Sequence, residues 1–183
     1  MKLHIFGASG SGVTTLGAAL SKRLNIPYFD SDEYFWVPSD PPYTLKRDPQ
    51  ERNDHMRMAL NRQDDWILGG SMYNWGEGVY PYFDLVVFLW IPPEIRMERI
   101  RKREMERYGE QILSDPERKM QSDAFIRWAS DYDANTGIAS RTLNVHEQWM
   151  KKMEYPILEI RTDLSTAARM DLILDQLSLL KMI

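Results

Sequence analysis

Short runs of apolar residues alternate along the chain with longer stretches in which apolar residues recur every three or four positions. The first pattern is typical of buried strands, and the second is typical of helices that cover a sheet. The runs that predict strands are residues 3–6, 26–29, 66–68, 85–91 and 157–160. The run at 85–91 has no polar position, as expected for a central strand covered on both faces. The alternation predicts an α/β fold with three layers, in which helices pack on both faces of a parallel sheet.

Three helices are predicted beside these strands. Helical spacing within residues 14–24 is carried by four apolar positions, Leu16, Ala19, Leu20 and Leu24. Pro92 and Pro93 end the fourth apolar run, and Pro93 suits the first turn of a helix over residues 94–107. Ser165 is placed to cap a closing helix, whose apolar stripe is Met170, Ile173, Leu174 and Leu177.

Two segments depart from this alternation. Residues 33–65 are rich in proline, aromatic and charged residues, and residues 108–150 are polar with a helical tendency. Both lie between predicted sheet units. We therefore expect them above the carboxyl ends of the strands, where ligands of open α/β folds bind.

Composition narrows the class of protein. The chain has 183 residues, of which 43% are hydrophobic and 27% charged, and this is typical of one globular domain. It has no cysteine, which excludes disulfides and thiolate metal sites. A formal net charge of −4 argues against general binding to nucleic acid or to anionic membranes. Since the chain also shows no signal peptide and no apolar run of about 20 residues, we expect a cytoplasmic protein.

A glycine-rich loop follows the first predicted strand and precedes the first helix. Residues 7–15 read Gly7-Ala8-Ser9-Gly10-Ser11-Gly12-Val13-Thr14-Thr15. They match the pattern G-x-x-x-x-G-K-[ST], except that Val13 occupies the position of the lysine. Glycines let successive N–H groups point at one anion, and the helix adds its positive N-terminal end. The alternative is a turn without a ligand. The strand–loop–helix context favours a phosphate site, with Thr14 at the position that ligates Mg²⁺.

The missing lysine has a chemical consequence. In this loop the lysine ammonium contacts the β- and γ-phosphates while charge shifts during transfer, and valine supplies no charge. Lys22 and Arg23 lie roughly 12–15 Å along the same helix, at about 1.5 Å per residue, which is too far. A replacement cation must come from another segment.

Polar residues end the second and third predicted strands. Asp30 and Asp32 could share a site, one holding Mg²⁺ and one orienting an acceptor hydroxyl; alternatively, Ser31 or Asp32 only caps a helix. Gly70 and Ser71 end the third strand, where glycine permits close approach of a ligand and serine offers a donor, or where the two form a simple turn. Tyr34 and Trp36 are further candidates, as aromatic side chains beside an acceptor.

The helix over 94–107 carries six basic residues interleaved with four acidic ones. Such a run is usually a solvated face with i,i+4 ion pairs. Arg99 and Arg103 share one side and could present both guanidinium groups to phosphate. The histidines stand near no serine or cysteine in the sequence and form no i,i+4 pair, so His4, His55 and His146 are interpreted as structural.

With these residues placed, the whole chain resembles the nucleoside monophosphate kinase group of P-loop proteins, especially adenylate kinase and shikimate kinase. The stretch FLWIPPEIRMERIRKR resembles the strand, proline and helix that lead into the adenylate kinase lid, and it places Arg99 and Arg103 on phosphate-gripping arginines. Arg141, in RTLNVHEQ, resembles a lid arginine. The Asp30-Ser31-Asp32 pair resembles shikimate kinase, and WILGG is also similar to relatives described as DNA-topology modulators.

The resemblance implies a five-stranded parallel sheet in order 2-3-1-4-5, an acceptor-binding insertion at residues 33–65 and a lid at 104–140. It also implies ATP and Mg²⁺. Together with the residues, it predicts a phosphotransferase in which Thr14 and Asp30 hold the metal, Asp32 acts on the acceptor, and Arg99, Arg103 and Arg141 close over the transferred group. The second hypothesis, favoured by Val13, is a non-catalytic nucleotide-binding protein that uses the same cleft as a switch.

Overall fold

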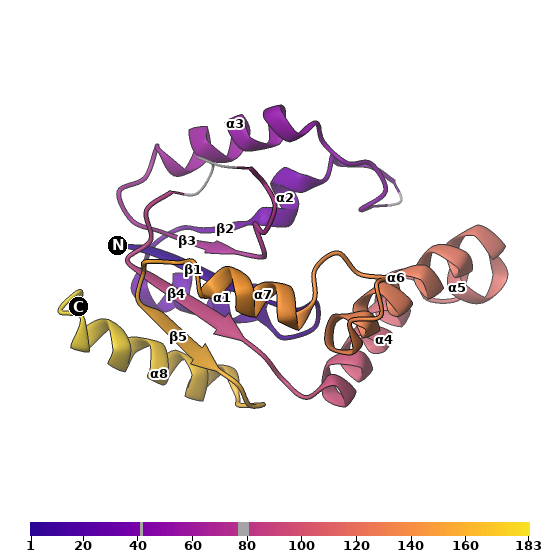
Figure 1. Cartoon of the computed structure of the whole chain (residues 1–183). Coiled ribbons are helices and arrows are strands. Elements are labelled where there is room, and N and C mark those ends of the chain that lie inside the picture. Colours follow the sequence, from indigo (N-terminus) through magenta and orange to yellow (C-terminus); the bar gives the residue numbers. More distant parts are fainter. Residues whose placement is uncertain (41, 77–80) are drawn as a thin grey trace.

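The computed structural model describes residues 1–40, 42–76 and 81–183. Its centre is a five-stranded sheet in the order β2-β3-β1-β4-β5, with every neighbouring pair parallel (Figure 1). The strands are β1 (Lys2–Gly7), β2 (Tyr28–Asp30), β3 (Trp66–Gly69), β4 (Leu85–Leu89) and β5 (Ile157–Ile160). This order and the layered α/β class confirm the prediction from the sequence.

Helices cover both faces of this sheet. They are α1 (Val13–Leu24), α2 (Ser31–Phe35), α3 (Pro49–Leu60), α4 (Pro93–Tyr108), α5 (Gln111–Ser114), α6 (Pro116–Ala134), α7 (Leu143–Met150) and α8 (Thr166–Leu179). Alternate strand residues face opposite layers. Leu3 and Ile5 of β1 pack in one core with α1 and α8, while Phe6 packs in the other with α3 and α7.

Local sequence accounts for where the helices begin. Pro93 is at the first turn of α4, and the Ser165 side chain accepts a hydrogen bond from the Ala168 N–H, so it caps α8 as predicted. Asp115 caps α6 in the same way, accepting from the N–H groups of Glu117 and Arg118. Within the described residues, no helix combines the length and apolar character that crossing a membrane requires.

The two unusual segments lie only in part beyond the carboxyl ends of the strands, because α3 and α7 within them pack on one face of the sheet. Residues 33–65 contain the end of α2 and the whole of α3, and residues 108–150 contain α5, α6 and α7. Figure 1 shows α4, α5 and α6 extending together away from the sheet, while α2 and α3 stand over β2 and β3. The space between these two groups of helices is where the candidate site lies.

Candidate functional site

A cavity of about 1550 Å³ opens at the carboxyl edge of the sheet. Its walls come from residues 7–15, the ends of β2 and β3, the helices α4 and α6, and the start of α8. Ligand pockets usually measure about 300–1,000 Å³. The cavity therefore has room for two small ligands side by side.

The phosphate loop (residues 7–15) takes the conformation that exposes its amides. Gly10 and Gly12 have φ of 84° and 98°, values that favour glycine over other residues. Gly12 is the N-cap of α1, and no side chain caps the helix there. The N–H groups of the first turn of α1 are therefore available to an anion, with the positive end of the helix behind them. Of the predicted loop residues, only Ser11 does not line the cavity: its side chain is fully buried.

Val13 begins α1 and lines the cavity without a charge. Its side chain also packs against the core between the sheet and the helices α1 and α8. Two buried arginines outside the loop approach its backbone instead. Arg96 of α4 donates to the Ser9 carbonyl oxygen at 3.2 Å, and Arg169 of α8 donates to the Ser11 carbonyl oxygen at 2.7 Å.

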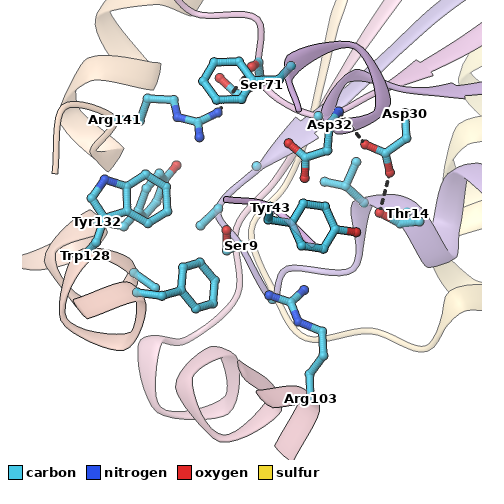
Figure 2. Close-up of a pocket in the computed structure, with 18 of the residues that line it drawn as sticks. Ser9, Thr14, Asp30, Asp32, Tyr43, Ser71, Arg103, Trp128, Tyr132 and Arg141 are labelled. Carbon is cyan, nitrogen blue, oxygen red and sulfur yellow. Dashed lines mark hydrogen bonds between the residues drawn. The ribbon is translucent and has the colours of Figure 1, made fainter. Parts of the chain in front are cut away.

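Asp30, the last residue of β2, is hydrogen-bonded to the phosphate loop. The Thr14 hydroxyl donates to the Asp30 carboxylate at 2.9 Å (Figure 2). The Tyr28 hydroxyl donates to the same oxygen at 3.1 Å. The other Asp30 oxygen accepts from the Asp32 N–H, so Asp30, rather than Ser31 or Asp32, caps α2. The capping role and the cavity-facing role are therefore compatible in one residue.

Thr14 and Asp30 fit a magnesium site of the kind that uses substrate phosphates. The described residues contain no cluster of three His, Cys, Asp or Glu that could hold a metal alone. Mg²⁺ typically keeps several waters and takes one or two carboxylates plus phosphate oxygens. One hydroxyl and one carboxylate beside a phosphate loop supply the protein's share of that set.

The Asp32 side chain points into the cavity beside Asp30 (Figure 2). Desolvation raises the pKa of Asp32, with a further increase from the negative charge of Asp30. The guanidinium groups of Arg141, Arg103 and Arg107 act in the opposite direction. Asp32 is thus a carboxylate with a raised proton affinity in a basic environment.

Three arginines that line the cavity act electrostatically on Asp32. Arg141 lies over the Trp128 ring at 5.3 Å, and Arg107 lies over the Tyr43 ring at 4.8 Å. Arg103 points into the cavity in Figure 2, and its buried Nε has no hydrogen-bond partner among the described residues. We call Asp32, Arg103, Arg107 and Arg141 the acceptor wall.

Arg99 has a different environment from Arg103, although the sequence places both on one side of α4. Its guanidinium makes two hydrogen bonds to the Asp163 carboxylate, at 2.8 and 3.1 Å, at the rim of the cavity. Asp163 also accepts from Arg169. Arg99 is therefore engaged with the protein, whereas Arg103 faces the cavity.

His146 contacts a serine in the structure, although no serine stands near it in the sequence. The Ser71 hydroxyl and His146 Nε2 lie 2.9 Å apart, and the Tyr132 hydroxyl lies 2.8 Å from His146 Nδ1. Burial lowers the pKa of His146 to about 3, so its ring is neutral and can donate at one nitrogen and accept at the other. The pair was missed because its members are 75 residues apart in the chain.

The remaining candidates separate into two groups. Gly70 and Trp36 line the cavity, and Gly70 has a φ of 95°. A Cβ at Gly70 would lie 2.0 Å from the Ser31 hydroxyl, so only glycine fits this turn. The Tyr34 side chain instead packs against the core next to α3, and it does not line the cavity.

The sequence contains a pattern that indicates the burial of Arg96 and Arg169, the two arginines that contact the phosphate loop. Arg169 stands four residues before Ile173 and eight before Leu177, in phase with the buried stripe of α8. Arg96 has the same relation to Ile100 in α4. A charged residue at a core-facing position is almost never buried without a partner. The position of these arginines on the buried side of each helix predicts a polar partner inside the protein, but it does not identify that partner.

Comparisons with known proteins agree with this geometry. A family model described as an AAA domain matches residues 4–125. The chain is 46% identical over 176 residues to the uncharacterized protein YqaC of Bacillus subtilis (strain 168), covering 96% of this chain and 97% of that protein.

Two solved structures share the fold at low identity. Deoxyadenosine kinase from M. mycoides with bound dATP has a TM-score of 0.59 at 16% identity, covering 97% of this chain and 100% of that one. Shikimate kinase from Aquifex aeolicus has a TM-score of 0.55 at 19% identity, covering 97% and 96%. The chain therefore has the fold of the P-loop kinases.

Proposed function

We propose, from the premise that this chain belongs to the AAA domain family of proteins, that it is an ATP-dependent phosphotransferase. It transfers the γ-phosphoryl group of ATP to a nucleoside monophosphate or to a small metabolite with a hydroxyl group. The observation that carries the proposal is the pairing of two sites in one cavity. The amide-lined phosphate loop and the Asp32 carboxylate with its three arginines line the same space.

Asp32 favours a hydroxyl acceptor over a phosphate acceptor. An alcohol must lose its proton during transfer, and a carboxylate with a raised pKa can accept that proton. A phosphate acceptor is already ionised at neutral pH, and a carboxylate beside it would repel it. Arg103, Arg107 and Arg141 would bind an anionic group elsewhere on the same molecule.

The residues divide the work as follows. The amides of the phosphate loop hold the β- and γ-phosphates, and Thr14 and Asp30 hold Mg²⁺, which when bound neutralises the developing charge. Asp32 accepts the hydroxyl proton while the acceptor oxygen bonds to the γ-phosphorus and the bond to the bridging oxygen breaks, releasing ADP. Arg103 and Arg141 stabilise the negative charge on the transferred group. Closure of α4–α6 over the cavity would exclude water.

Val13 supports a second candidate function, a nucleotide-binding protein that does not turn over. In that case the same loop binds the nucleotide, and the position of α4–α6 reports its presence. The two candidates differ in one observable, the release of ADP that depends on an acceptor.

Incubation of the protein with ATP, Mg²⁺ and a panel of acceptors tests the proposal. The panel should contain nucleoside monophosphates, nucleosides, hydroxy acids, and the matching alcohols that lack the carboxylate. The ADP released is measured by coupled oxidation of NADH. Lys102→Met is a matched control, because Lys102 is 76% exposed on the outer side of α4 and pairs only with Glu106 among the described residues. Acceptor-dependent ADP release, equal in the control, supports a kinase. Saturable ATP binding without such release favours the second function.

A further inference from the structure

Two carbonyl groups of the phosphate loop accept hydrogen bonds from arginines. Arg96 lies 87 residues from Ser9 and Arg169 lies 158 residues from Ser11, so neither contact follows from local chain geometry. The guanidinium group of Arg169 also approaches Gly12, where a Cβ would lie 3.1 Å from its Nη1. Positive charge therefore sits next to the loop immediately before Val13.

Both arginines are buried and have a carboxylate partner. Arg96 is 1% exposed and pairs with Asp133, and Arg169 is 4% exposed and pairs with Asp163. Burial lowers the pKa of Arg169 and the charge of Arg99 lowers it further, whereas Asp163 opposes that change. Arginine stays protonated in proteins. Two full charges are thus held beneath the loop, although each is partly compensated by its partner.

The geometry of the peptide unit decides where this charge acts. The C=O of one residue and the N–H of the next belong to one planar group and point in opposite directions. The Ser9 carbonyl shares its peptide group with the Gly10 N–H, and the Ser11 carbonyl shares its group with the Gly12 N–H. A cation bonded to the oxygen strengthens the dipole whose positive end is the N–H.

We propose that Arg96 and Arg169 supply, through these two peptide groups, the positive charge that Val13 removes from the loop. They are positioning residues, since they touch loop carbonyls rather than the nucleotide. The inference rests on the proposed nucleotide site and deepens it. It explains how the loop binds a triphosphate with no cation of its own.

A purely structural role for Arg169 makes different predictions, and two substitutions separate the alternatives. If Arg169 only tethers the loop, Val13→Lys cannot restore what Arg169→Met loses. If it supplies charge, the lysine restores it. For Asp163→Asn, the two roles predict changes in ATP affinity of opposite sign. The substitution keeps the shape of the side chain but removes the negative charge beside Arg169 and Arg99. A charge role predicts tighter ATP binding, and a tethering role predicts weaker binding.

Isothermal titration of Mg·ATP into the five chains tests this proposal: wild type, Arg169→Met, Val13→Lys with Arg169→Met, Asp163→Asn and the control Lys102→Met. We expect a loss of roughly 10- to 100-fold in affinity for Arg169→Met. We expect recovery of at least tenfold on adding Val13→Lys, a gain of about two- to tenfold for Asp163→Asn, and no change for Lys102→Met.

Thermal unfolding of each chain identifies variants that do not fold. If Arg169→Met does not fold, the sign of the Asp163→Asn effect still decides between the two roles. Unchanged affinity in Arg169→Met, failure of the lysine to restore binding, or weaker binding by Asp163→Asn would overturn the inference while leaving a wild-type nucleotide site in place. A wild-type chain that binds no ATP would instead contradict the proposed function and this inference with it.

Discussion

The two sides of the cavity use their arginines differently. On the phosphate-loop side, Arg96 and Arg169 are buried and donate to backbone carbonyls, and each also pairs with a carboxylate. On the acceptor wall, Arg103 and Arg107 stack on aromatic rings and line the open cavity beside Asp32. One set of charges acts on the protein itself, and the other faces the space that a ligand would fill.

This difference predicts which substitutions change both stability and ligand binding, and which change ligand binding alone. Buried arginines that bond the backbone hold the loop in one conformation before any ligand arrives, so a change there should affect folding and nucleotide binding together. Side chains that face a cavity contribute little to the folded state. A change there should affect the acceptor step and leave stability nearly intact.

Asp32→Asn should have the largest effect on the acceptor side. If Asp32 accepts the hydroxyl proton, its loss removes general-base catalysis, and kcat should fall by roughly 10²- to 10⁴-fold. ATP affinity and the unfolding temperature should stay close to those of the wild type, because the amide keeps the shape and the Asp32 N–H bond to Asp30. Steady-state kinetics and calorimetry on the same preparation measure both. A matching loss of ATP affinity would place Asp32 on the nucleotide side.

Arg141→Met should come next in size. Arg141 donates to the Ser71 carbonyl oxygen at 3.4 Å and lies near Asp32, so it is available to an anionic acceptor. Loss of one charge-assisted hydrogen bond should raise KM for the acceptor by roughly 10- to 100-fold. The kcat should fall as well, because Arg141 is also proposed to stabilise the transferred group. The KM for ATP should change by less than about threefold. Equal increases in both constants would show that the two sides of the cavity are not separable.

Acid should lower the stability of the whole fold, because two buried histidines stay neutral in it. Burial lowers the pKa of both His4 and His146 to about 3, so both stay neutral in the folded chain. The unfolded chain binds these protons below about pH 6.5, and stability should therefore fall as pH drops from about 6.5 towards 3. Each histidine contributes a slope of about 1.4 kcal/mol per pH unit in that interval.

Urea unfolding at pH 7, 6 and 5 measures this slope. His146→Gln should reduce it, because one of the two buried imidazoles is removed, whereas the exposed His55→Gln should leave it unchanged. A free energy of unfolding that is flat from pH 7 to pH 5 would mean that the imidazoles are charged in the folded protein.

Patterns within a short stretch predicted most of the fold. The run at 157–160 coincides with β5, and the predicted central strand ends two residues early, at Leu89. The Trp90 N–H still donates to the Ile160 carbonyl, but its indole nitrogen donates to Asp133 of α6. Strand β2 begins later than predicted, at Tyr28. Such boundaries depend on the neighbouring strand, which the local pattern does not contain.

The candidate site was predictable only where a motif is contiguous. Residues 7–15 and the pair Asp30 and Asp32 are recognisable because their spacing along the chain is fixed by one loop or one strand end. The contacts of Arg169 with Ser11, and of His146 with Ser71, join residues far apart in sequence. They arise when the sheet brings α8 and α7 beside the loop and β3. The spacing of apolar residues within one helix or strand does not predict these contacts.

The central claim is that backbone amides of residues 7–15 form an anion site that works without its own lysine. Titration of ATP, ADP and AMP, each with Mg²⁺, into the unmodified chain tests it most directly. We expect one saturable site per chain, with affinity that falls at each removal of a phosphate group. Absence of saturable binding, or equal affinity for all three nucleotides, would contradict it.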